Sequence, residues 1–277
     1  MSKNLGLKKS IAHHGEFVIE YFPNDCLAAG TVAVGKAWEP HILSFSKEHG
    51  FENAIDIGAN FGYHTLFFSK IATGKVYAFE PQIQNYELLT NNIRYNQIDN
   101  VVLYDKACSD KVEQVKMPLI STTNMINMGD FTPNVMVSSE HSIVDTIPLD
   151  HLNLPKIDLI KIDVQGYEIK VLNGARALIS NYKPTLIIEF EQHQLVKTGS
   201  SVYELIQCIR DLGYFIFYLE YEYPSDHVCI HKDNLDAFNE KFKNSIFDHT
   251  HDNGINHNIH YGINKKIKIK TPDQKSP

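Results

Sequence analysis

The chain has 277 residues, of which 43% are hydrophobic and 21% charged, so wholesale disorder is excluded and a sizeable buried core is expected. Because the formal net charge is -7 at pH 7, a basic face for nucleic acid is not expected. No apolar run approaches the roughly 18 residues that a membrane span needs, and Met1–Ser10 lacks the apolar segment of a secretory signal.

The four cysteines lie far apart in the sequence and form no Cys-x-x-Cys pair. Cys208 and Cys229 lie in apolar contexts, which indicates buried thiols. A disulfide framework or a zinc site is therefore not expected, and the sequence favours a reducing, cytoplasmic compartment.

Residues 1–50 precede the regular part of the chain and are expected to pack on the core as an extension with a strand at Phe17–Tyr21 and a helix at Trp38–Glu48. From there on, short apolar runs alternate with amphipathic stretches, which predicts right-handed βαβ units and a mostly parallel, Rossmann-like α/β sheet. The runs typical of buried strands are Ala54–Ile57, Val76–Phe79, Val101–Tyr104, Leu159–Ile162 and Leu186–Phe190, and two of the helical stretches are Ile83–Tyr95 and Tyr167–Ser180.

The alternation continues with a helix at Val202–Leu212 and a strand at Phe215–Leu219, separated by Gly213. Val228–His231 is expected to close the sheet as an antiparallel edge strand. The main domain is therefore predicted to span residues 51–248.

Two segments depart from this pattern. Residues 111–149 form an insertion without a clear helix, which is either a lid over a substrate or a surface β-hairpin without a role in recognition. Residues 249–277 are expected to form a polar, flexible tail. Its four histidines match no metal-ligand spacing and are His249, His251, His257 and His260.

The most informative motif is the run Asp56-Ile-Gly58-Ala-Asn60-Phe-Gly62, which follows a predicted strand and opens a helix. This is the context that a nucleotide-binding turn requires. Gly58 allows the tight turn, and Gly62 removes a side chain where the helix start approaches the ligand or the sheet. The helix N-terminus adds free N–H groups and the positive end of the helix dipole.

Two features of this loop favour S-adenosylmethionine (SAM) over a nicotinamide dinucleotide. The loop lacks the third glycine of the GxGxxG fingerprint. Asp56 would repel a diphosphate, whereas it would favour the ammonium and sulfonium groups of SAM directly or through water.

The ends of the next two strands supply further candidates for an adenosine ligand. Glu80 lies 22 positions after Gly58 (80 − 58 = 22), where a carboxylate accepts both ribose hydroxyls, although a solvated charge at a strand end is the alternative. The turn after the third strand is where the adenine ring lies in such folds. Ala107 and Ser109 are the candidate contacts there, and a plain turn is the alternative.

Five runs together resemble the FkbM family of SAM-dependent methyltransferases, namely AIDIGANFGYHT, VYAFEP, LLTNNIRYN, DLIKIDVQGYEIKVLNGA and PTLIIEF. Their order and spacing match from about residue 53 to residue 189. The resemblance implies a class I methyltransferase fold, SAM as the methyl donor and usually a hydroxyl acceptor. It implies SAM contacts at Asp56, Gly58, Asn60, Gly62 and Glu80.

Three further positions compare with the family's blocks. Asn92 and Asn96 match the polar positions of its helical block. Gln165 departs from the pattern, because the family usually has a glutamate there, and the lost charge makes Gln165 a poor candidate for an essential acid or ligand.

The candidate catalytic residues are Lys161, Asp163 and Glu189. Lys161 and Asp163 are two apart and share a face of the fourth strand, and Asp163 and Glu189 lie at strand ends on the ligand side of an open α/β sheet. A carboxylate or a desolvated lysine could take the acceptor's proton, or Asp163 and Glu189 could hold Mg²⁺. A buried Lys161–carboxylate pair that only fixes the sheet is the structural alternative.

These residues predict a SAM-dependent methyltransferase that transfers a methyl group to a hydroxyl of a small molecule or a glycan. The same βαβ pattern leaves a nicotinamide-dependent oxidoreductase as one alternative. A non-catalytic SAM-binding module is the other.

Overall fold

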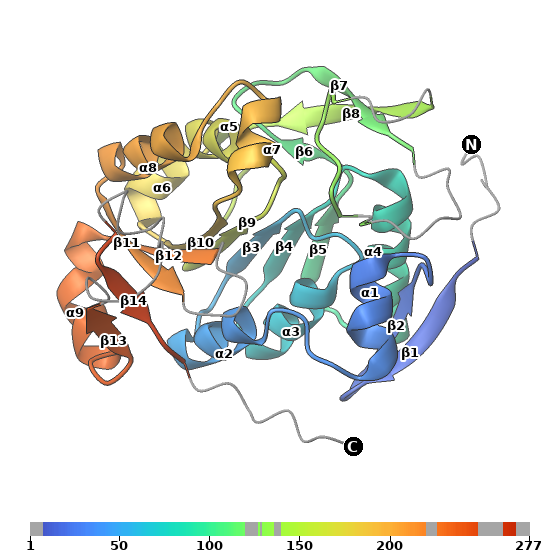
Figure 1. The fold of residues 1–277 in the computed structure, drawn as a ribbon, viewed down its shortest axis with the longest axis horizontal. Coiled ribbons are helices and arrows are strands. Elements are labelled where there is room, and N and C mark those ends of the chain that lie inside the picture. Colours follow the sequence, from blue (N-terminus) through green and yellow to red (C-terminus); the bar gives the residue numbers. More distant parts are fainter. Residues whose placement is uncertain are drawn as a thin grey trace.

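The computed structural model describes residues 8–119, 127, 129–135, 140–219, 226–248 and 263–269. Its central sheet has parallel strands β3 (Ala54–Ile57), β4 (Val76–Phe79), β5 (Val101–Tyr104), β9 (Leu159–Ile162) and β10 (Thr185–Glu189). The further strands are β11 (Tyr214–Leu219), β12 (Asp226–His231), β13 (Ile246–Asp248) and β14 (Lys265–Ile267). The strand order is β13-β14-β11-β12-β10-β9-β3-β4-β5 (Figure 1). The predicted Rossmann-like α/β sheet is confirmed.

The chain order of the strands reverses at β3, because β4 and β5 follow on one side of it and β9 and β10 on the other. Such a switch point opens a crevice at the carboxyl ends of the strands, where open α/β sheets bind ligands. The Asp56 loop and Asp163 follow the two strands that flank this point.

The antiparallel part of the sheet differs in detail from the prediction. The strand expected at Val228–His231 is β12, but it lies inside the sheet between β10 and β11, antiparallel to both. The edge is β13, which is antiparallel to β14. Position in a sheet depends on pairing between remote segments, and apolar composition alone does not specify it.

Part of the segment expected to be a flexible tail is a strand of the sheet. β14 pairs in parallel with β11, and its Ile267 is fully buried in the core. The four histidines of the tail lie outside the described residues.

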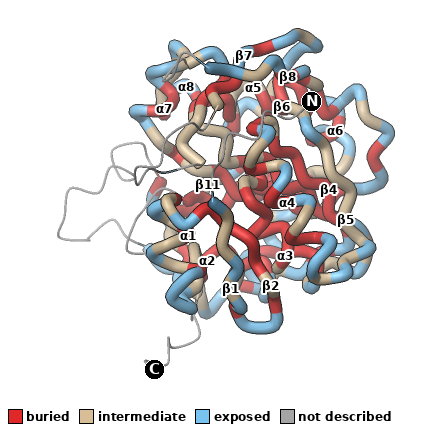
Figure 2. Tube along the Cα trace, turned by 90° about the vertical axis from the view of Figure 1, so that its right-hand side faces the viewer, coloured by how far each residue is buried: buried red, intermediate tan, exposed pale blue. Residues whose placement is uncertain are grey.

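Helices cover both faces of the sheet (Figure 1). One face packs against α5 (Glu168–Asn173), α6 (Arg176–Tyr182) and α8 (Val202–Asp211), with Ile57 and Ile162 pointing into that core. The other face packs against α2 (Pro40–His49), α3 (Tyr63–Ile71), α4 (Ile83–Tyr95) and α9 (Leu235–Lys241). Figure 2 shows the buried residues concentrated in the strands.

The helix predicted at Tyr167–Ser180 is broken into α5 and α6 at Gly174. A Cβ added at Gly174 would lie 1.9 Å from the carbonyl oxygen of Ser109, so the backbones touch there and only glycine fits. The remaining short helices are α1 (Cys26–Gly30), α7 (Gln192–Lys197), η1 (Val32–Val34), η2 (Leu149–His151) and η3 (Lys232–Asn234).

The insertion at 111–149 contributes to a small separate sheet. β7 (Gln114–Pro118) and β8 (His141–Ile147) are antiparallel, and β6 (Ala107–Cys108) pairs with β8. Residues 120–126, 128 and 136–139 lie outside the described residues. The antiparallel strands β7 and β8 match the β-hairpin expected as one alternative for residues 111–149. A role of this segment as a lid over the substrate stays a prediction.

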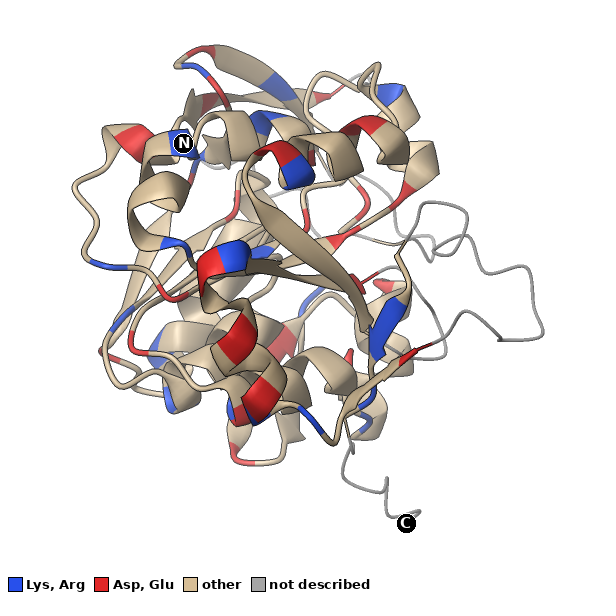
Figure 3. Cartoon of the chain, turned by 90° about the vertical axis from the view of Figure 1, so that its left-hand side faces the viewer, with Lys and Arg blue, Asp and Glu red and all other residues tan. Residues whose placement is uncertain are grey.

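Figure 3 shows that Lys and Arg positions are interspersed with Asp and Glu positions along the chain. No helix in the described ranges is both long and apolar enough to span a membrane.

The N-terminal hairpin of β1 (Ser10–His14) and β2 (Phe17–Tyr21) is held to α4 by the two asparagines of the family block. Asn92 accepts a hydrogen bond from the Glu20 N–H at 2.6 Å and donates to the carbonyl oxygens of Glu20 (3.0 Å) and Phe61 (2.8 Å). Asn96 likewise bonds both backbone groups of Val18. Both asparagines have a structural role, because they hydrogen-bond backbone N–H and C=O groups of strand β2.

Replacing Asn92 with alanine should therefore lower the free energy of unfolding by about 2–4 kcal/mol, because three buried backbone groups lose their partner. Asn91→Ala is the matched control. The Asn91 side chain donates a partly buried hydrogen bond to Glu20 Oε2 at 2.7 Å. Its loss should lower the free energy of unfolding by about 1 kcal/mol or less. Urea unfolding measures the stability of both variants. Equal losses of unfolding free energy would contradict the structural role of the Asn92 hydrogen bonds.

Candidate active site

A cavity of about 590 Å³ opens at the carboxyl ends of β3, β4, β9 and β10. The glycine loop after β3 and the turn after β9 form its floor, and residues before α2 form one wall. Gly129, Asp130 and Phe131 of the insertion line it from the opposite side. Its size falls within the range of about 300–1,000 Å³ that is typical of small-molecule sites.

The glycine loop is fixed by backbone contact. Gly58 has a φ of +83°, and a Cβ added there would lie 1.7 Å from the carbonyl oxygen of Asp163. The ends of β3 and β9 can therefore approach this closely only with glycine at this position.

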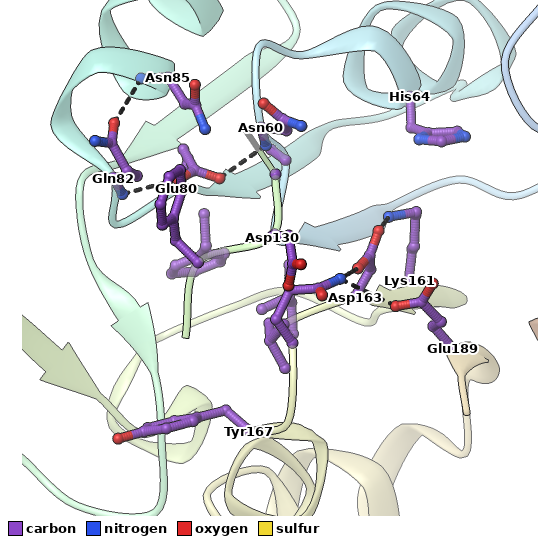
Figure 4. A pocket seen from close by; sticks show the side chains of 18 of the residues that line it. Asn60, His64, Glu80, Gln82, Asn85, Asp130, Lys161, Asp163, Tyr167 and Glu189 are labelled. Atoms are coloured by element: carbon purple, nitrogen blue, oxygen red, sulfur yellow. Dashed lines mark hydrogen bonds and ion pairs between the residues drawn. The ribbon is translucent and has the colours of Figure 1, made fainter. Parts of the chain in front are cut away.

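Glu80 lies at one end of the cavity, between the glycine loop and the start of α4 (Figure 4). Its Oε2 accepts the N–H of Asn60 and its Oε1 the N–H of Gln82, both at 2.8 Å. Burial raises the pKa of Glu80 to about 7, against the lowering effect of these two bonds. The carboxyl group is thus held rigidly and titrates near neutrality.

Lys161 is the buried cation of the site. It is 3% exposed on β9, and its Nζ lies 3.0 Å from Asp163 Oδ2. Burial alone would lower the pKa of Lys161, but the carboxylates of Asp163, Asp56 and Glu39 raise it above its usual value. A lysine held in its charged form fits the role of a base less well than a carboxylate does, and the role of Lys161 stays a prediction.

Gln165 joins the two predicted catalytic carboxyl groups. Its Nε2 donates to Asp163 Oδ1 at 3.0 Å and to Glu189 Oε2 at 3.1 Å, which extends a chain of bonds from Lys161 to Glu189 (Figure 4). Gln165 has a φ of +53°, a backbone conformation that costs free energy for any residue other than glycine. Thr132 of the insertion donates to its carbonyl oxygen at 2.7 Å.

Asp163 and Glu189 differ in their ionisation. Burial acts to raise the pKa of Asp163, but the Lys161 charge and hydrogen bonds hold it below its usual value. Burial and the nearby charges of Asp163, Asp226 and Glu39 raise the pKa of Glu189 well above its usual range. Two carboxyl groups thus differ in protonation, a pattern typical of acid–base pairs.

Four acidic side chains gather at this end of the cavity, and we name them the carboxylate cluster: Glu39, Asp163, Glu189 and Asp226. Asp226 Oδ2 lies 2.6 Å from Nε2 of His41, and Glu39 Oε2 lies 3.2 Å from Nε2 of His64. Glu39 is held at a φ of +45°. Strained backbone at a cavity wall is typical of functional sites.

Seven of the predicted site residues line this cavity: Gly58, Asn60, Glu80, Ala107, Lys161, Asp163 and Glu189. Three others do not line it. Asp56 is fully buried and accepts a hydrogen bond from Thr65 Oγ1 at 2.6 Å. A Cβ at Gly62 would lie 2.6 Å from Leu89 of α4, so Gly62 makes room for a helix. Ser109 is buried against Gly174.

Sequence reasoning missed Trp38, Glu39, His41 and Asp226 as cavity residues. They come from the segment before α2, from the first turn of α2 and from β12, and they carry no motif. The pairing of β12 with β10 sets Asp226 opposite Glu189, and the packing of α2 places the other three at the cavity. Glu191 and His193, which follow β10, also line the cavity, and Oε2 of Glu191 lies 2.7 Å from Nδ1 of His193.

The suggested Mg²⁺ site gains no support. The described residues contain no group of three or more His, Cys, Asp or Glu side chains that could hold a metal. Asp163 and Glu189 are instead bridged by the Gln165 amide.

Comparison with known proteins shows the family to which the chain belongs. Residues 56–216, more than half of the chain, match the methyltransferase FkbM domain, and the chain belongs to this family. The hexuronic acid methyltransferase AglP of Haloferax volcanii is 31% identical over 155 residues, which cover 49% of this chain. The chain spans 56% of the length of AglP. The resemblance to the FkbM family is therefore confirmed.

Two solved structures are similar at low identity. The FkbM methyltransferase from Methylobacillus flagellatus is 18% identical with a TM-score of 0.47, over 65% of this chain and 43% of that one. A putative methyltransferase from Streptococcus mutans in complex with SAH is 15% identical with a TM-score of 0.42, over 69% and 94%.

Replacing Gln165 with methionine should lower the free energy of unfolding by about 1–2 kcal/mol, because two partly buried carboxyl groups lose one shared donor. Gln114→Met is the matched control. Gln114 makes the same type of bond to Asp145 at 3.1 Å on the exposed surface, so less than about 0.5 kcal/mol is expected. Chemical denaturation compares the stability of the two variants. An unchanged free energy of unfolding in Gln165→Met would contradict a stabilising role for the Gln165 hydrogen bonds to Asp163 and Glu189.

Proposed function

We propose that this chain is a SAM-dependent O-methyltransferase acting on a hydroxyl group of a small molecule or a glycan. The observation that carries the proposal is a cavity with a rigid carboxyl group, Glu80, at one end and the carboxylate cluster at the other. Membership of the methyltransferase family fits this division. The name of the relative AglP, a hexuronic acid methyltransferase, supports a glycan-type acceptor.

The residues at the Glu80 end fit the adenosine part of SAM. Each oxygen of Glu80 already accepts one backbone N–H and retains a lone pair for a ribose hydroxyl. Ala107 and Cys108 offer apolar contact on the same side. Gly58 and Asn60 of the glycine loop line the cavity beside Glu80. Asp56 would act on the cofactor only through its charge, because it does not line the cavity.

SAM, when bound, supplies a methyl group that is activated by the adjacent sulfonium. The protein must align the acceptor oxygen with that carbon and receive the acceptor's proton. The hydroxyl proton of the acceptor would pass to Asp163, the ionised member of the Asp163–Glu189 pair, as the methyl group supplied by SAM is transferred to the oxygen. Lys161 keeps Asp163 ionised, and Gln165 fixes the distance between the two carboxyl groups.

The alternative functions differ in cofactor or turnover. An oxidoreductase would need the pyrophosphate of a dinucleotide to lie near Glu80 and Asp163, which is unfavourable. A module that only binds SAM would need none of the bonds that link Lys161, Asp163, Gln165 and Glu189.

The affinity for S-adenosylhomocysteine (SAH) should depend on pH through Glu80. Its pKa is about 7, and the ribose hydroxyls favour the ionised form, so affinity should fall about tenfold from pH 8 to pH 6. In Glu80→Gln the affinity should be weaker and nearly independent of pH. Calorimetry measures this, with Glu87→Gln on the exposed face of α4 as the control that keeps the slope. An unchanged slope in Glu80→Gln would remove Glu80 from the ribose site.

Asp163→Asn should lower kcat for methyl transfer by about 10²–10⁴-fold, the usual contribution of a positioned base, while SAH affinity stays within about threefold. The buried Glu168 is the matched control. Burial raises the pKa of Glu168 to about 7, and this residue lies outside the cavity lining, so Glu168→Gln should keep kcat. Methyl transfer to a screened acceptor gives the readout. Equal kcat in both variants would argue against Asp163 as the proton acceptor.

A further inference from the structure

The end of the cavity away from Glu80, which we name the acceptor end, is lined by Trp38, His64, Lys161 and the carboxylate cluster. Figure 4 shows Lys161, Asp163, Glu189 and His64 together on the side opposite Glu80 and Gln82. If the Glu80 end holds adenosine, these side chains face the acceptor. The chemistry of this end therefore determines which acceptors can enter.

Positive charge at the cavity is already neutralised. Lys106 and Lys161 are the two Lys or Arg residues among the described residues that line it. Lys161 Nζ lies 3.0 Å from Asp163, and Lys106 Nζ lies 3.3 Å from Asp145. An acceptor carrying a carboxylate near its reacting hydroxyl would lie beside Asp163 and Asp226, and both lysines that line the cavity among the described residues already pair with other carboxylates.

Two buried polar atoms at the acceptor end lie within ion-pair distance of each other but make no hydrogen bond of good geometry to any described residue. They are Nε2 of His64, whose side chain is 6% exposed, and Oε2 of Glu39. The two atoms lie 3.2 Å apart. Burial lowers the pKa of His64 well below its usual value and raises that of Glu39. A neutral imidazole and a carboxyl group both bond well to hydroxyls, which donate and accept.

Trp38 adds an apolar wall to this polar end. It is half-buried, and its ring centroid lies 5.6 Å from Phe61 and 6.0 Å from Tyr63. Its backbone N–H donates to the Tyr63 hydroxyl at 3.1 Å, which fixes the position of the segment before α2. A rigid aromatic face beside hydroxyl-binding groups matches a molecule with one C–H face and a rim of hydroxyls.

We infer that the acceptor is an uncharged polyhydroxylated molecule of the sugar type, and that the acceptor end rejects a uronic acid. This inference rests on the proposed function, because it assumes that SAM occupies the Glu80 end.

The test uses two probes that differ only at C6: methyl β-D-glucopyranoside and methyl β-D-glucopyranosiduronic acid. Each is titrated calorimetrically at pH 7.5 into the full chain saturated with SAH. The neutral glycoside should bind at least tenfold more tightly than the uronic acid. Equal or tighter binding of the uronic acid, or binding of neither probe, would overturn the inference while SAH binding kept the proposed function. Failure of SAH itself to bind would instead overturn the proposed function.

Two variants test the assigned groups. Trp38→Ala should lose at least tenfold affinity for the neutral glycoside with SAH affinity kept, whereas Tyr203→Ala, at an exposed aromatic, should change neither. His193→Lys places a cation beside Glu191 at the cavity, so it should narrow the preference for the neutral probe at least threefold. An unchanged preference in His193→Lys, or unchanged glycoside binding in Trp38→Ala, would contradict the assignment.

Discussion

The ammonium group of Lys161, buried on the central strand β9, is the charge on which the site depends. It lies beside Asp163, and the Asp56 and Glu39 carboxylates also act on it. Removing one partner of a buried pair typically costs about 3–5 kcal/mol, because the other charge is left uncompensated. Lys161 therefore keeps Asp163 ionised, while burial favours the protonated form of Glu189 and Glu39. One buried cation thus divides a group of carboxyl side chains into different protonation states.

Local patterns predicted the parts of the molecule that depend on neighbours in the sequence. Strands β3, β4, β5 and β9 and helix α4 have the predicted bounds, because short apolar runs and amphipathic spacing are read over a few residues. Glu80 and Gly58 were found because a strand end and a tight turn constrain residue type locally. The FkbM resemblance added the order of these parts, and family membership confirms it.

Contacts between remote segments could not be predicted from the sequence. Trp38 and Asp226 reach the cavity only through the packing of α2 and the pairing of β12. Gly62 was expected to approach the ligand or the sheet, yet it faces Leu89 of α4, because turn chemistry does not specify what packs against a turn. Gln165 was set aside for its lack of charge, but its amide can donate to two carboxyl groups at once, which a glutamate could not do.

The most direct test of the account is a calorimetric titration of the purified chain with SAH and, separately, with NADH. The account predicts micromolar binding of SAH at one site per chain and no binding of NADH, because the Glu80 end accepts ribose hydroxyls while the acidic cavity repels a pyrophosphate. Binding of NADH without SAH, or binding of neither, would contradict the assignment of the cavity to SAM.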